Sequence, residues 1–184
     1  PLRLVHWALV VTVAGAWITH YAGIQWFVWH RRLGYATLVL VTFRLVWGFV
    51  GTRHARFANF VRGPAAVLAY LRAGGRADTP GHSPLGALSV VAMLAVLLAQ
   101  ALTGLFANDE IANAGPFYGW VTQQTSNRFS GFHATNSKLL LGLIALHVAA
   151  IGWYVFVLRR PLVRAMLAGR RGPREIATGN GIAG

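Results

Sequence analysis

The sequence predicts an all-α membrane protein, a bundle of four transmembrane helices whose N- and C-termini both lie in the cytoplasm. Of its 184 residues, 55% are hydrophobic and only 11% are charged, whereas a soluble domain carries about 25% charged residues. Four long stretches are nearly free of charge, and each approaches the roughly 20 residues that a helix needs to cross the hydrocarbon layer. Because lipid offers no hydrogen bonds to the backbone, these stretches are expected to be helices.

The composition argues against several other classes of protein. With no cysteine, the chain cannot form disulfides, thiolate zinc sites, iron–sulfur clusters or covalent c-type haem attachments. The formal charge of +13 is compatible with nucleic acid binding, but the basic residues alternate with long apolar stretches, which favours a membrane and no nucleic acid partner. No Ser-His-Asp or P-loop arrangement is visible. No carboxylate of the kind common in zinc or di-iron sites lies within a span.

The predicted elements form a single integral-membrane domain, residues 1–184. Its four spans are expected at about residues 4–22, 30–51, 85–107 and 132–158. Residues 57–73 carry apolar side chains flanked by arginines and predict an amphipathic helix at the membrane interface, although an ordinary surface helix fits equally well. The link 108–131 is polar and long for a simple turn, so it is expected to dock against the bundle or cap it.

The basic residues predict the orientation of the spans, because cytoplasmic links carry an excess of Lys and Arg. Arg3 precedes the first span, and the second link and the segment after the fourth span hold most of the other arginines. The opposite links hold fewer charges, namely Arg31, Arg32, Arg128, Lys138, Asp109 and Glu110. Both termini are therefore expected in the cytoplasm, with the opposite face in the periplasm if the chain lies in a bacterial inner membrane.

Histidines within the spans give the clearest functional signal, because ionisable residues at that depth point to function by default. His133 and His147 are 14 residues apart, which places them about 40° apart around one helix and about 21 Å apart along it. Two imidazoles on one face at two depths suit two cofactors, one toward each side of the membrane. His54 and His82 fall in the second link and are expected to be solvated loop residues.

Depth along the helices selects a partner for each of these histidines. His30 opens the second span level with His133, and His6 lies early in the first span on the side of His147. Each pair is expected to supply both axial ligands of a b-type haem (protohaem IX), which gives two haems in all. With both axial positions filled, the iron has no site for O₂, which favours electron transfer. The alternative is that these are interfacial or interhelical polar residues.

Three further residues share these faces. Arg44 follows His30 by 14 residues, and a buried arginine needs an anion, for which a haem propionate is suited. Gly34 lies one turn after His30, where the missing side chain would let a porphyrin ring approach the helix. His20 follows His6 by 14 residues. It could replace His30 as a ligand, bind a propionate or a quinone, or rest at the interface.

Several short motifs occur in a consistent order along nearly the whole chain. They are Arg3-Leu-Val-His6-Trp7, His30-Arg-Arg-Leu-Gly34-Tyr35, Phe43-Arg44-Leu-Val-Trp47-Gly48, Gly81-His82-Ser83-Pro84-Leu85-Gly86, Leu102-Thr103-Gly104, the pair His133 and His147, and Met166-x-x-Gly169. In these motifs the chain resembles the bacterial cytochrome b561 family, which includes the cytochrome b subunits of membrane nickel–iron hydrogenases.

The resemblance implies a four-helix dihaem membrane cytochrome whose ligands are His6, His30, His133 and His147, and it ranks His30 above His20. Family members pass electrons between the quinone pool and partners such as a hydrogenase or a c-type cytochrome. One branch is thought to oxidise superoxide and reduce quinone. Typical hydrogenase subunits have a fifth helix, so this chain looks closer to the short, stand-alone members; its Ser83 also stands where an Asn is expected.

The leading hypothesis is therefore electron transfer across the membrane, through two b-type haems, between membrane quinone and a periplasmic redox partner such as a c-type cytochrome. One alternative is a superoxide:quinone oxidoreductase that acts without a partner protein, for which the basic residues of the periplasmic links offer a positive approach. Others are the membrane-anchor subunit of a hydrogenase-like complex and a haem-free anchor or small transporter. Membrane lipid surrounds the chain in each case, and an oligomer is compatible with all of them.

Overall fold

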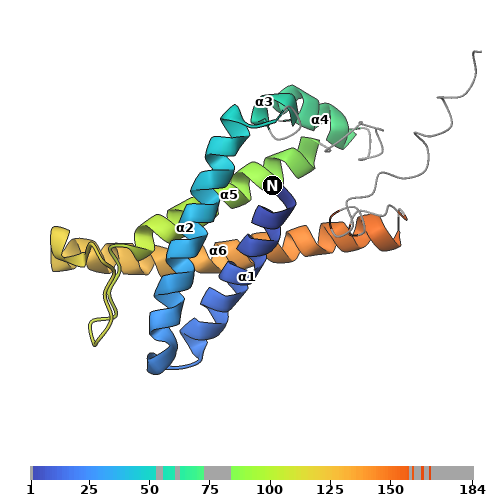
Figure 1. The fold of residues 1–184 in the computed structure, drawn as a ribbon. Helices are drawn as coiled ribbons and strands as arrows, with labels where there is room; N and C mark the ends of the chain where they lie inside the picture. Colours follow the sequence, from blue (N-terminus) through green and yellow to red (C-terminus); the bar gives the residue numbers. More distant parts are fainter. Residues whose placement is uncertain are drawn as a thin grey trace, which may run out of the picture. The chain divides into compact units, whose positions relative to one another are not determined.

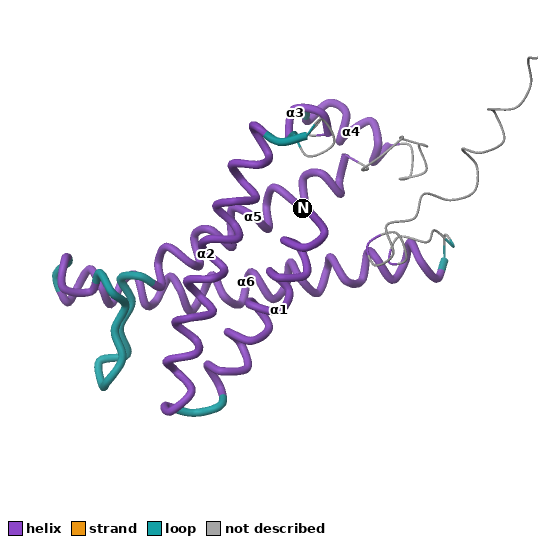
Figure 2. Tube along the Cα trace, in the orientation of Figure 1, coloured by secondary structure: helices purple, strands orange, loops and turns teal. Residues whose placement is uncertain are grey.

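Four long helices make up most of the chain in the computed structural model (Figure 1). They are α1 (Leu2–Tyr21), α2 (Phe27–Val50), α5 (Pro84–Gly104) and α6 (Gln123–Phe156). Shorter helices are α3 (Phe57–Phe60), α4 (Pro64–Arg72) and the 3₁₀ turns η1 (Ile24–Trp26) and η2 (Tyr118–Trp120). The structure describes residues 2–52, 56–60, 63–72 and 84–157, with the single positions 159, 163 and 166. Within these residues every regular element is a helix (Figure 2), which confirms the all-helical prediction.

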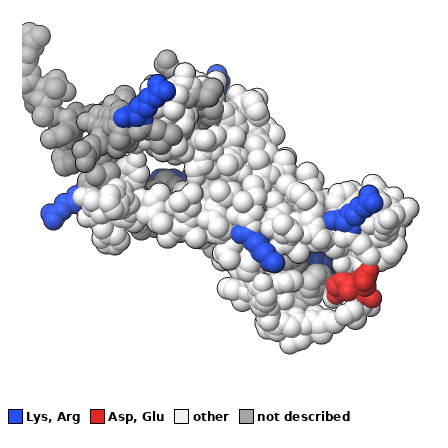
Figure 3. Space-filling view, turned by 180° about the vertical axis from the view of Figure 1, so that it is seen from behind, with Lys and Arg blue, Asp and Glu red and all other residues white. Residues whose placement is uncertain are grey.

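All four long helices are long and apolar enough to cross a membrane, the second of them counted from Ile24. Many of their large apolar side chains are exposed, including Phe49 at 72%, Ile18 at 68% and Val39 at 68%. Lys, Arg, Asp and Glu are sparse on the face shown in Figure 3. A soluble monomer rarely exposes so large an apolar surface, whereas lipid solvates it. The chain is therefore a multi-pass membrane protein with four candidate spans.

The first two long helices form an antiparallel pair joined by a tight turn. Gly23 has a φ of 110°, a backbone conformation that glycine adopts without strain, and η1 follows it directly. Along the pair, Thr12 Oγ1 lies 3.0 Å from Thr37 Oγ1. A Cβ atom on Gly15 would lie 2.9 Å from Leu33 Cδ1, so this glycine lets the two helices approach each other.

The fourth long helix begins at Gln123, well before residue 132, where the sequence places its start. Thr122 caps the helix, since its Oγ1 accepts a hydrogen bond from the main-chain N–H of Thr125 at 3.3 Å. The first turns are rich in Gln, Thr, Ser and Asn, and such residues in an isolated stretch favour loops. Here their side chains face the 105–122 loop, so the polar sequence reflects a docking surface on a helix.

Asn108 fastens the 105–122 loop to this polar surface. Its Nδ2 donates to Ser126 Oγ at 2.5 Å and to Asn127 Oδ1 at 2.9 Å. Its main-chain N–H donates to Ser130 Oγ at 2.9 Å. Ser126 is fully buried and donates in turn to the main-chain oxygen of Phe106 at 2.6 Å. The loop is thus held on α6 by several hydrogen bonds, in agreement with the docking role expected from its length.

Two short helices occupy the segment 57–72, where the sequence predicts one amphipathic helix over 57–73. Residues 61, 62 and 73 lie outside the described residues. The second of the helices begins at Pro64, and proline suits a first helical position because its missing N–H would be unpaired there. The first lies against α2, where a Cβ atom on Gly48 would come within 2.1 Å of Phe57 Cε2. The location of this segment at a membrane surface stays a prediction.

The chain divides into two compact units, residues 1–144 and 145–184. The first unit contains α1 to α5, the loop and the larger part of α6. The second unit contains the end of α6 with His147. Each unit is described by itself below, and the organisation of the whole chain as a single domain stays a prediction.

Replacing Asn108 with alanine should loosen the loop, because Ser126 Oγ and Asn127 Oδ1 lose the side-chain Nδ2 donor, and Ser126 is buried. Loss of such a partner costs about 1–3 kcal/mol, so the free energy of unfolding in detergent should fall by that amount. Thr135→Val is the matched control, because within the described residues the Thr135 hydroxyl bonds to the main chain of its own helix alone, at Gly131. Equal stability of the two variants would contradict the role given to Asn108.

Candidate functional site

Three histidines from three helices converge at the loop end of the first unit. His20 lies in the last turn of α1, His30 lies in the first turn of α2, and His133 lies on α6. The ring centroids of His20 and His30 are 5.4 Å apart, and those of His30 and His133 are 6.3 Å apart. The structure therefore brings together the two residues that the sequence pairs, His30 and His133, and places His20 beside the first of them.

Both members of this pair are fixed by a hydrogen bond at the same ring nitrogen. His30 Nδ1 lies 2.8 Å from the main-chain oxygen of Ala16, and His133 Nδ1 lies 2.9 Å from that of Gln100. A carbonyl oxygen can only accept, so each Nδ1 carries the proton and each Nε2 keeps a lone pair. A histidine that ligates a metal typically holds its second nitrogen in this way. The pair is thus prepared to donate two Nε2 lone pairs.

The separation of the two rings suits a single metal ion between them. An imidazole nitrogen binds a transition metal at about 2 Å and lies about 1 Å from its ring centroid, so two rings on opposite sides of one ion have centroids about 6 Å apart. The centroid distance of 6.3 Å between His30 and His133 matches that spacing, and their ring planes are nearly perpendicular, at 81°. Among the described residues, no group of three or more His, Asp or Glu side chains could hold a metal ion. Two-point ligation is therefore the arrangement that the geometry offers.

A cavity of about 350 Å³ opens between the helices at this point, and its wall includes His20, His30, Gly34, Gly104 and His133. Its volume lies within the range of small-molecule and cofactor sites, about 300–1,000 Å³. A Cβ atom on Gly34 would meet nothing within 4 Å, so this glycine leaves open space in the cavity wall, and its contact with a porphyrin stays a prediction. The residues present therefore fit a flat cofactor that needs two axial imidazoles.

Helix α5 supplies contacts to His133 that sequence reasoning missed. Thr103 Oγ1 lies 3.3 Å from His133 Nδ1, and a Cβ atom on Gly104 would lie 3.1 Å from His133 Cε1. Asn136 Nδ2 donates to Gln100 Oε1 at 2.7 Å. Polar side chains inside apolar spans are the signal that points to such residues, because an amide in a membrane needs a partner.

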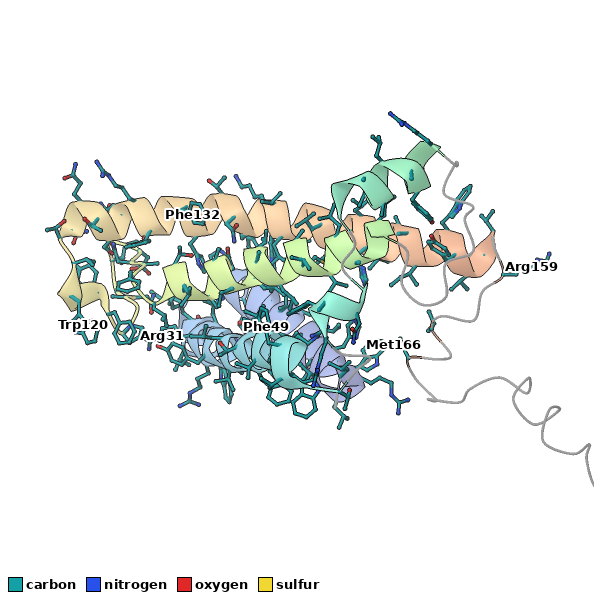
Figure 4. All side chains as sticks on the ribbon, turned by 90° about the horizontal axis from the view of Figure 1, so that it is seen from above. Arg31, Phe49, Trp120, Phe132, Arg159 and Met166 are labelled. Atoms are coloured by element: carbon teal, nitrogen blue, oxygen red, sulfur yellow. The ribbon has the colours of Figure 1, made fainter. Side chains whose placement is uncertain are left out.

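The 105–122 loop contributes Asn108, Asp109 and Asn113 to the cavity wall. Arg31 Nη1 donates to the main-chain oxygen of Ala114 at 3.2 Å and so links α2 to the loop (Figure 4). The turn itself is organised by Asp109, whose carboxylate accepts hydrogen bonds from the main chain of residues 111–113. The main-chain and side-chain N–H groups of Asn113 contribute most to holding the pKa of the Asp109 carboxyl well below its usual range.

Of the other predicted residues, His6 and Arg44 belong to the first unit and are not part of this cavity wall. His6 is on α1, with its ring centroid 5.4 Å from that of Trp7. The guanidinium carbon of Arg44 lies 5.1 Å from the centroid of the Phe57 ring, and its Nη1 is buried with no hydrogen-bond partner within the described part of the chain. A buried, unpartnered guanidinium N–H suits an anion. His147 is on α6 in the second unit, so its pairing with His6 stays a prediction, and His54 and His82 lie outside the described residues.

Comparison with known proteins gives one family match. The family model described as prokaryotic cytochrome b561 matches residues 1–169, which is nearly the whole chain and confirms the resemblance seen in the motifs. No curated protein and no solved structure matches the chain significantly.

The loop at the cavity should show a pH dependence that originates in Asp109. A carboxyl whose folded pKa lies below its unfolded value of about 3.9 stabilises the fold fully above that value and loses its effect as pH falls further. Asp109→Ala should therefore lower the thermal unfolding midpoint at pH 7, with a smaller difference from the parent protein at pH 3. Glu110→Gln leaves the Asp109 contacts in place and is the control. A difference that stays constant between pH 7 and pH 3 would argue against this assignment.

Proposed function

Because the chain belongs to the prokaryotic cytochrome b561 family, which implies haem-based electron transfer across a membrane, we propose that it carries electrons through two b-type haems. One haem would be held by His30 and His133, and the other by His6 and His147. The electrons would pass between membrane quinone and a periplasmic redox partner such as a c-type cytochrome. The chain would lie in a bacterial inner membrane with both termini in the cytoplasm.

One observation carries the proposal, namely the placement of His30 and His133. Their centroids are 6.3 Å apart, each Nδ1 is engaged by a main-chain carbonyl, and both rings face a cavity of about 350 Å³. His30 and His133 would hold a haem through their two imidazoles, and a haem held by two histidines would supply electron transfer and leave no site for oxygen. This arrangement supports ligation by His30 in preference to His20.

A b-type haem supplies one-electron redox chemistry when it is bound. The chain's own residues would bind and shield it. The main-chain oxygens of Ala16 and Gln100 orient the imidazoles, and Gly34 leaves room in the cavity wall for a ring system. Asn108, Asp109 and Asn113 contribute to the cavity wall on the loop side, where they would shield the cofactor from water.

The second haem would lie toward the cytoplasm, since His147 follows His133 by 14 residues on the same helix. Arg44 would bind a propionate of a haem, which supplies the anion that its buried Nη1 needs. Two haems at two depths would allow electrons to cross the bilayer in two steps. Quinone would exchange electrons with the protein from within the membrane.

A second candidate function is superoxide:quinone oxidoreductase activity without a partner protein. The observation that favours it is the presence of two cationic residues, Arg31 and Lys138, in the wall of the same cavity. Positive charge at the mouth of a cleft raises the local concentration of a small anion such as superoxide. Rapid reduction of the bound haem by superoxide, followed by quinone reduction, would separate this activity from transfer to a protein partner.

The purified protein should show the visible absorbance of b-type haem at two haems per chain, and His133→Ala should retain only one. Removing one axial imidazole leaves the haem of that pair without half of its ligation, whereas the other pair is untouched. The measurement is the ratio of haem to protein by pyridine haemochrome assay. The same assay on His30→Ala and His20→Ala identifies the partner of His133, with haem loss expected for His30→Ala alone. An unchanged ratio in His133→Ala would refute the ligand assignment.

Gly34→Phe should lower the haem content without unfolding the protein, because the new ring enters the open space of the cavity. Gly142→Phe is the matched control: Gly142 also has open space around it and lies about 180° around α6 from His133. The haem-to-protein ratio and the helical circular dichroism of both variants are compared. Full haem content in Gly34→Phe would show that this cavity does not hold the cofactor.

A further inference from the structure

Asn136 is a buried polar residue within a membrane-spanning helix, and its side chain reaches a neighbouring helix. It is 6% exposed. Its Nδ2 donates to the main-chain oxygen of Val96 at 3.0 Å and to the side-chain oxygen of Gln100 at 2.7 Å, both on α5. An amide group within an apolar layer is unfavourable unless it is hydrogen-bonded. The two bonds therefore give Asn136 a defined position against α5.

Asn136 contacts Gln100, the residue whose main-chain oxygen orients His133. Asn136 follows His133 by one helical turn on α6, and both side chains reach Gln100. Asn136 binds the Gln100 side chain, whereas His133 Nδ1 lies 2.9 Å from the Gln100 main-chain oxygen. Asn136 thus fixes the height of α5 relative to α6 at the level where the carbonyl meets the imidazole.

Thr103 and Gly104 also restrict the orientation of the His133 ring. Thr103 Oγ1 lies 3.1 Å from the Gln100 main-chain oxygen and 3.3 Å from His133 Nδ1. Gly104 leaves room for the ring, since a Cβ atom there would lie 3.1 Å from His133 Cε1. The imidazole therefore lies against α5 at Gln100, Thr103 and Gly104.

We propose that Asn136 is a positioning residue that sets the reduction potential of the haem held by His30 and His133, through the hydrogen bond from His133 Nδ1–H to the Gln100 carbonyl. The inference rests on the proposed function. A carbonyl that accepts from Nδ1–H makes the imidazole a stronger donor to the metal, and stronger donation stabilises ferric iron. Displacement of the carbonyl weakens that donation and favours the reduced state.

The test compares the two midpoint potentials of the haem-loaded protein with those of Asn136→Leu, which has a similar volume but no amide. Equilibrium redox titration, followed by haem absorbance, should show one potential raised and the other unchanged, with both haems retained. The electron paramagnetic resonance signal of the shifted ferric haem should broaden, since the ring is less well fixed. Thr135→Val is the control. It removes a side-chain hydrogen bond of α6 to its own main chain at Gly131, and it should move neither potential.

Gln100→Leu is the second variant, in case Asn136→Leu fails to fold. It removes the side-chain acceptor and keeps the main-chain carbonyl, so it should give a shift in the same direction but smaller. Unchanged potentials and resonance signals in a dihaem Asn136→Leu or Gln100→Leu protein would overturn the inference. So would a change no different from that of Thr135→Val. Absence of haem from the parent protein would instead overturn the proposed function, so the two failures are distinguishable.

Discussion

The site depends on one constraint. Each imidazole within the apolar bundle needs a hydrogen-bond acceptor for its Nδ1 proton and keeps a lone pair at Nε2. In His30 and His133 the Nδ1 proton goes to a main-chain carbonyl of a neighbouring helix, at 2.8 and 2.9 Å. This hydrogen bond fixes the tautomer and leaves Nε2 with a lone pair that can bind a metal. A carbonyl in a helix already accepts one main-chain bond and has a second lone pair to offer. The main chain of a neighbouring helix can therefore supply the hydrogen-bond acceptor that orients a ligand.

The surrounding structure keeps the main-chain carbonyls of Ala16 and Gln100 level with the imidazoles that they orient. Along α1 and α2, the approach of Gly15 to Leu33 and the contact between Thr12 and Thr37 bring Ala16 beside His30. Along α5 and α6, the polar contacts around Gln100 do the same for His133. The 105–122 loop connects the α1–α2 pair to the α5–α6 pair, since Asn108 binds it to α6 and Arg31 binds it to α2. The exposed ring of Trp120, 76% exposed, lies at this end as well (Figure 4).

Much of this arrangement could be predicted from the sequence, and the parts that were missed share a physical cause. Charge-free stretches identify spans because lipid excludes charge, and equal depth along helices suffices to bring His30 and His133 together. The early start of α6 at Gln123 was missed because Ser126, Asn127 and Ser130 have the composition of a loop, although they form the docking surface for Asn108. The roles of Gln100 and Asn136 were missed because a single amide in a span does not reveal its partner. Only the packing of α5 against α6 does so.

The central claim is tested most directly by an experimental structure of the haem-loaded protein at a resolution that separates the imidazole atoms. The account predicts a porphyrin between the helices in the cavity beside Gly34, with its iron between Nε2 of His30 and Nε2 of His133. A structure in which the iron takes His20 as its axial ligand, or in which the rings of His30 and His133 face away from the cofactor, would contradict it.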